Sequence, residues 1–243
     1  MAYNPRQDVR LDYGASPDIH EYVDPRLREY MLRVYNFMAG GLIVSGLTGY
    51  IAARTGFYQQ IAGTPLIWIV MLAPLAAVLV LSFRIERMSV AAAQLTFWVY
   101  ALLMGLSLSG IFLVYTGASI ARTFFIAAAT FGAMSLYGYV TGRDLTRVGS
   151  FLFMGLIGII LASVVNLFVA SPALEFVISV IGVILFVGLT AYDTQRIKNI
   201  YIEAEAKGDE AISKKAVLGA LTLYLDFINL FLMFLQLTGE RRD

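Results

Sequence analysis

Seven apolar segments, each close to the roughly 20 residues needed to cross the hydrocarbon core of a bilayer, follow one another along this chain. Hydrophobic residues make up 59% of the sequence and charged residues 14%, whereas a soluble domain usually has about a quarter of charged residues. The sequence therefore predicts an all-α integral membrane protein built from seven transmembrane helices. We expect the seven segments at residues 34–53, 65–83, 90–115, 120–140, 150–169, from 173 past 193, and 216–237.

A polar segment, residues 1–29, precedes the first apolar segment and lacks the apolar run of a secretory signal. We interpret it as a cytosolic N-terminal tail, followed by a transmembrane domain at residues 30–243. The single histidine, His20, lies in this tail and the chain has no cysteine, so a His-based or Cys-based metal centre is excluded. The net charge of +1 argues against a nucleic-acid partner, which requires a basic face.

The basic residues predict the orientation, because cytosolic links carry an excess of Lys and Arg. Assigning alternate links to one side places fourteen Lys and Arg residues with the N-terminal tail and four on the opposite side. The N-terminus is therefore expected in the cytosol and the C-terminus on the other side of the membrane. The four on that far side are Arg54, Arg122, Arg241 and Arg242.

Two acidic residues, Asp193 and Asp226, occur inside the last two apolar segments. An unpaired charge at the centre of a bilayer costs ~3 kcal/mol even on insertion scales, so an intramembrane acid indicates a function and a partner. We expect each aspartate to be the partner of the other. No glycine or proline follows Asp193 until Gly208, so the sixth helix is expected to continue to Glu203, which brings both acids to a similar depth. Arg196 and Lys198 would then line a hydrated cytosolic vestibule.

The stretch GLTAYDTQRIKNIY, the stretch ALTLYLDFINLFLMFL and the seven-span layout resemble the transmembrane Bax inhibitor motif family, in particular its bacterial branch, over residues 30–238. This resemblance implies a bundle in which six helices surround a central seventh, and a pH-sensitive calcium leak in the bacterial inner membrane. It also implies a di-aspartyl sensor at Asp193 and Asp226. A counter-charge at the cytosolic end of the second helix maps onto Arg84 or Arg87, which flank Glu86; Arg84 is favoured.

The chemistry of the two acids agrees with this implication. Two carboxyl groups a few ångströms apart in a poorly solvated site cannot both ionise freely, so the pair is expected to share a proton. When charged, the same oxygens are suited to Ca²⁺, which takes six to eight oxygen ligands. Two side chains cannot supply that number, so a calcium site at Asp193 and Asp226 is expected to be weak and transient. No cofactor is expected; the bilayer and the permeant Ca²⁺ are the expected partners.

Three other functions compete with a channel. An intramembrane aspartyl protease also uses two carboxyl groups, but Asp226 follows Tyr-Leu here and not the Gly-x-Gly of that class. A retinal protein needs a lysine inside the last helix, and no lysine follows Lys215. The third alternative is a stress-response module that binds and restrains a protease or another membrane partner without conducting ions. We expect a protein that is not an enzyme.

Overall fold

The computed structural model describes residues 24–242, so His20, Arg6, Arg10 and most of the predicted tail lie outside the described residues. Within this range, seven helices are long and apolar enough to cross a membrane, as the sequence predicts. Since successive spans run in alternate directions, we name the two ends of the bundle the Pro25 end and the Arg54 end. The long helices are α1 (Pro25–Arg54), α3 (Leu66–Arg84), α4 (Val90–Leu108), α6 (Gly117–Val140), α7 (Thr146–Val169), α8 (Pro172–Glu205) and α9 (Asp209–Thr238). The short ones are α2 (Phe57–Ala62), η1 (Ile85–Arg87) and α5 (Ile111–Val114).

Local sequence explains where the helices begin and end. The Asp24 carboxylate accepts a hydrogen bond from the backbone N–H of Arg26 (2.9 Å), and Pro25 occupies the first turn, where proline is tolerated. Helix α1 therefore begins within the segment interpreted as the tail. At the other boundary, α8 continues to Glu205 and the chain turns at Gly208, whose φ of 91° favours glycine. The predicted extension of the sixth helix is thus confirmed.

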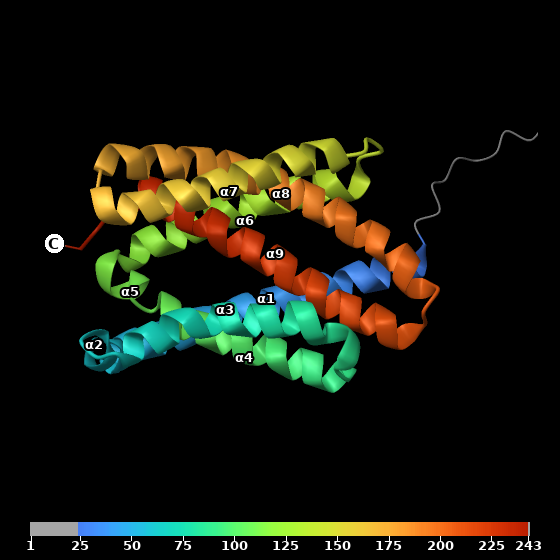
Figure 1. Cartoon of the computed structure of the whole chain (residues 1–243), viewed down its shortest axis with the longest axis horizontal. Coiled ribbons are helices and arrows are strands. Elements are labelled where there is room, and N and C mark those ends of the chain that lie inside the picture. Colours follow the sequence, from blue (N-terminus) through green and yellow to red (C-terminus); the bar gives the residue numbers. More distant parts are fainter. Residues whose placement is uncertain (1–23, 243) are drawn as a thin grey trace, which may run out of the picture.

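Helix α9 lies at the centre of the bundle. Figure 1 shows it crossing diagonally between a group formed by α1, α3 and α4 and a group formed by α6, α7 and α8. In its most apolar stretch, 61% of the residues are buried, which is the largest share among the seven spans of the described chain. Helix α9 packs against α8, α1, α6 and α4, whereas α7 packs mainly against α8. The central seventh helix that the family resemblance implies is therefore present.

Small residues and hydrogen bonds let the helices approach one another closely. The Ser45 hydroxyl of α1 lies 2.7 Å from the Tyr224 hydroxyl of α9 and 2.7 Å from the backbone oxygen of Ala101 in α4, so it joins three helices in the buried core. Gly138 of α6 packs directly on the backbone of Ala191 in α8, two residues before Asp193. Close backbone contact of this kind drives helix association where no water is available to be displaced. The first contact joins α9 to α1 and α4, and the second joins α6 to α8 beside the candidate site.

Candidate functional site

The structure brings Asp193 and Asp226 together inside the bundle. Asp193 lies on α8 and Asp226 on α9, and their residues are only 4% and 6% exposed. The two carboxyl groups lie within interaction distance of each other. An ionised carboxylate has no proton to donate, so a hydrogen bond between the two groups requires that one of them is protonated. The geometry is therefore that of a pair able to share a proton.

The two helices form an antiparallel hairpin around Gly208, and this arrangement explains why the acids meet. Because α8 continues twelve residues beyond Asp193 to Glu205, both acids lie several turns from the Gly208 turn. Had α8 ended near Arg196, Asp193 would lie at a helix end and Asp226 deep in the bundle. The pair is therefore aligned because α8 continues without a break from its apolar part into its polar end.

One oxygen of each carboxyl group, Asp193 Oδ1 and Asp226 Oδ2, has no hydrogen-bond partner among the described residues. Both residues line a cavity of about 630 Å³ between α7, α8 and α9. Its walls are mainly apolar, with Thr222 and Asn229 adding polar atoms near Asp226. Within residues 24–242, no group of three or more His, Asp or Glu side chains gathers. A cation held by this pair would therefore take most of its oxygen ligands from water.

Arg196 is the basic residue that lies nearest the pair. Its guanidinium lies 3.9 Å from Asp193 Oδ1, one helical turn further along α8, and is about half exposed. Arg196 also lines a second cavity of about 440 Å³ toward the Pro25 end, which is rich in polar side chains. It therefore lies between the buried acids and the polar end of the bundle. The residues of this second cavity include Thr146, Tyr192, Gln195, Asn199, Glu203 and Lys215.

Sequence alone predicts Arg196 in the vestibule and does not predict it as a counter-charge to Asp193. The sequence feature that indicates this ion pair is the spacing in Tyr-Asp-Thr-Gln-Arg. Asp193 and Arg196 are three residues apart, and residues with this spacing lie on the same face of a helix. Lys198 behaves differently from the prediction. Its ammonium group donates to the backbone oxygen of Tyr139 in α6 (2.9 Å) and lies over that tyrosine ring, so it faces α6 and not the vestibule.

Arg84 lies exposed at the end of α3, and α3 packs mainly on α4. In the described part of the chain, neither Arg84 nor Arg87 lies within ion-pair distance of a carboxylate, while Glu86 pairs with Lys215 of α9 at 2.6 Å. Glu86 therefore contacts α9 and does not hold a neighbouring arginine. A contact between Arg84 and the aspartates would require α3 to approach α8, so its role stays a prediction.

The residues that follow Asp193 hold the neighbouring elements in place. The Thr194 hydroxyl lies 2.9 Å from Ser135 of α6. Gln195 accepts a hydrogen bond from Leu145 N–H (2.9 Å) and donates one to the Arg143 backbone oxygen (2.8 Å), which fixes the link between α6 and α7. In that link, the Thr146 hydroxyl and N–H donate to Asp144, and they hold the pKa of its carboxyl below the usual range. The rim of the polar cavity is thus an ordered part of the structure.

Seven membrane-spanning helices and a buried carboxyl pair between the last two define an integral membrane protein with an intramembrane acidic site. The chain belongs to the family described as "Inhibitor of apoptosis-promoting Bax1", whose model matches residues 27–243. It is 47% identical over 230 residues to the inner membrane protein YbhL of Escherichia coli strain K12, which covers 93% of this chain and 98% of that protein. An uncharacterized protein of Rickettsia prowazekii is 51% identical over 221 residues, covering 90% of this chain and 93% of that protein.

Proposed function

We propose that this protein is a pH-sensitive calcium leak channel of a bacterial inner membrane, with Asp193 and Asp226 as its gate and transient cation site. The observation that carries the proposal is that two buried carboxyl groups lie against each other and line the same cavity. The membrane assignment is supported by a relative that is named an inner membrane protein. The proposed role is transport and not catalysis.

The proton state of the pair sets the state of the gate in this proposal. With one proton present, the hydrogen bond between the carboxyl groups holds α8 against α9. When that proton leaves, two negative charges repel each other at short distance in a poorly solvated site, which loosens the contact. The same charges attract Ca²⁺, and water completes its shell. Two carboxylates bind Ca²⁺ weakly enough to release it, as conduction requires.

Arg196 and Arg84 have separate roles in this scheme. Arg196 competes with a cation for Asp193 and separates the buried cavity from the polar cavity at the Pro25 end. Arg84 is proposed to supply the counter-charge to Asp193 in a second, fully closed conformation in which α3 approaches α8. Both arginines oppose cation occupancy, but they act in different conformations.

The test of the proposal is calcium flux into liposomes that contain the purified full-length chain. With a calcium indicator inside, flux is expected at neutral pH and should decrease as the pH is lowered from about 8 to about 5, because protonation restores the carboxyl hydrogen bond. Protein-free liposomes serve as the control. An absence of flux at every pH in this range would reject the channel and favour the module that restrains a membrane partner.

Removing the Arg196 charge is expected to raise calcium flux. In Arg196→Gln, Asp193 loses its competing cation, and because the guanidinium is about half exposed the gain at neutral pH should be only about two- to fivefold. Lys198→Gln is the matched control: it removes a cation two positions away that faces α6. The measurement is the initial rate of calcium entry into liposomes.

A different outcome would assign the role of counter-charge to an arginine at the end of α3. If Arg196→Gln leaves the flux unchanged and Arg84→Ala raises it, Arg84 controls the gate in the conformation that limits the rate. If Arg87→Ala is the active variant, the role lies three residues further along, at the end of η1.

A further inference from the structure

A second opening lies on the other side of α9, away from the aspartates, between α1 and α6. Two adjoining cavities of about 750 and 550 Å³ share the lining residues Leu42, Phe124 and Phe227. Helix α9 supplies the floor, and α1 and α6, which both pack on α9, supply the walls. Together the cavities form one elongated groove, here called the α1–α6 groove. Among the described residues, no Asp or Glu lines it.

Two arginines lie at the Arg54 end of the groove. Arg54 and Arg242 both line the 550 Å³ cavity. The Arg54 Nε donates to the Tyr50 hydroxyl (3.2 Å), and its guanidinium lies over the Tyr50 ring. Within residues 24–242, neither arginine lies within ion-pair distance of a carboxylate. The nearby Arg241, in contrast, pairs with Glu175 at 3.9 Å. The groove therefore ends in two cations that no carboxylate of residues 24–242 neutralises.

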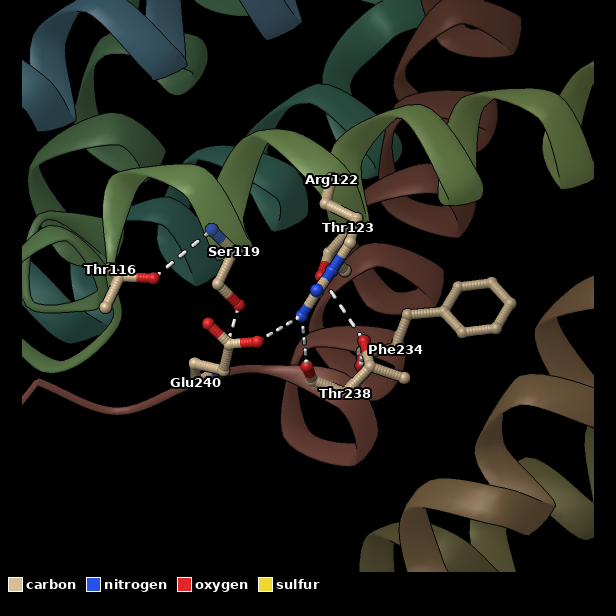
Figure 2. Close-up of polar contacts among 7 residues, drawn as sticks. All are labelled: Thr116, Ser119, Arg122, Thr123, Phe234, Thr238 and Glu240. Carbon is tan, nitrogen blue, oxygen red and sulfur yellow. Dashed lines mark hydrogen bonds and ion pairs between the residues drawn. The ribbon is translucent and has the colours of Figure 1, made fainter.

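The backbone of Arg242 is fixed by the segment that follows α9, which lies along the link between α5 and α6. The Arg242 N–H donates to the Val114 oxygen (2.8 Å), and the Thr116 N–H donates to the Glu240 oxygen (3.0 Å). Figure 2 shows how the Glu240 carboxylate accepts from Arg122 at 3.0 Å, while the Glu240 N–H donates to Ser119 at 2.9 Å. These contacts hold the backbone of Arg242 at the groove before any ligand binds.

The positions of the charges match the depths of lipid headgroups. Arg28 lines the opposite end of the groove and lies 26 residues before Arg54 on the same helix. At about 1.5 Å per residue the two are roughly 39 Å apart, close to the ~40 Å thickness of a bilayer with its headgroups. Arg54 therefore lies near the phosphate level, and the apolar floor between the two ends lies at the depth of acyl chains.

We propose that the α1–α6 groove binds an anionic phospholipid, with its phosphate between Arg54 and Arg242 and its acyl chains against the aromatic side chains of Phe124, Phe227 and Phe231. A guanidinium pair suits a phosphate because arginine can donate two parallel hydrogen bonds to it. A second copy of this chain would place arginine against arginine across the same surface. A transmembrane helix would match the apolar floor but would offer nothing to the two charges. This site is separate from the carboxyl pair and does not depend on the proposed channel function.

The test is lipid binding to the purified full-length chain, measured by native mass spectrometry. Phosphatidylglycerol and phosphatidylcholine with identical acyl chains are compared in the wild type, Arg54→Gln and Arg242→Gln. Phosphatidylglycerol should bind more tightly, and each substitution should weaken it about fivefold, as expected for the loss of one cation near a lipid surface. Arg241→Gln is the matched control, since its side chain pairs with Glu175, and it should bind as the wild type does.

A further variant tests the acyl-chain part of the groove. Gly46 lines it on α1, and a Cβ added there would meet no atom within 4 Å, so Gly46→Leu should extend into the groove and fold normally. We expect this variant to bind phosphatidylglycerol more weakly, although no charge has changed. Equal binding of the two lipids, wild-type binding in both arginine variants, or full displacement of the lipid by an equal concentration of inorganic phosphate would each overturn the proposal.

Discussion

Asp226→Asn is expected to abolish the pH dependence of calcium flux in liposomes and to reduce the flux itself at least about tenfold. The amide cannot take up or release a proton at these pH values, so the shared proton and the charge change are both lost. It also removes half of the charged oxygen ligands available to Ca²⁺. Asparagine has nearly the same shape and can still donate a hydrogen bond to Asp193, so the fold is expected to persist. The measurement is the initial rate of calcium entry as a function of pH.

Two further variants make this result specific. Asp193→Asn should produce the same flat profile, since each acid needs the other. Asp209→Asn changes an exposed acid in the first turn of α9, the helix that carries Asp226, and should leave the pH profile of the flux unchanged. A wild-type pH response in either Asp193→Asn or Asp226→Asn would separate the carboxyl pair from gating.

Gly138→Ala is expected to lower the free energy of unfolding by about 2 to 3 kcal/mol, as for an overpacked core. A methyl group at Gly138 would overlap the backbone oxygen of Ala191, and a backbone atom cannot rotate away as a flexible side chain can. Helix α6 would therefore have to separate from α8 next to Asp193. Unfolding by denaturant in detergent measures the effect, and calcium flux should change in the same variant.

Gly132→Ala provides the matched control on the same helix. A methyl group there meets no atom of the described chain within 4 Å, so the variant should unfold as the wild type does or slightly later. Equal stability of Gly138→Ala and Gly132→Ala would show that the close contact between α6 and α8 contributes little.

The fold follows from the sequence to a large extent, because the membrane imposes a simple length requirement on each span. The seven apolar segments predict the seven spans, and the absence of Gly and Pro before Gly208 predicts the full length of α8. The start of α1 was harder to predict, because four of the nine residues 25–33 are charged and these residues extend the helix beyond the apolar segment. The capping of that helix by Asp24 is a local signal that hydropathy does not detect.

The candidate site could be predicted only in part. Acids are rare inside apolar segments, so Asp193 and Asp226 stand out from the sequence alone. Which partner the Arg196 and Lys198 side chains contact depends on how the neighbouring helices pack, and the sequence of α8 alone does not specify that packing. The α1–α6 groove is also tertiary, since it forms where two helices pack on α9 and leave a space between them. No periodicity in either helix marks such a space.

Infrared spectroscopy of the carboxyl groups, on the full-length chain in lipid at about pH 5, where the gate is expected to be closed, tests most directly whether the two acids share a proton. The account predicts one protonated, buried carboxyl group per chain in the wild type and none in the double variant Asp193→Asn/Asp226→Asn. A wild-type spectrum without a protonated carboxyl group, or an unchanged signal in the double variant, would contradict it.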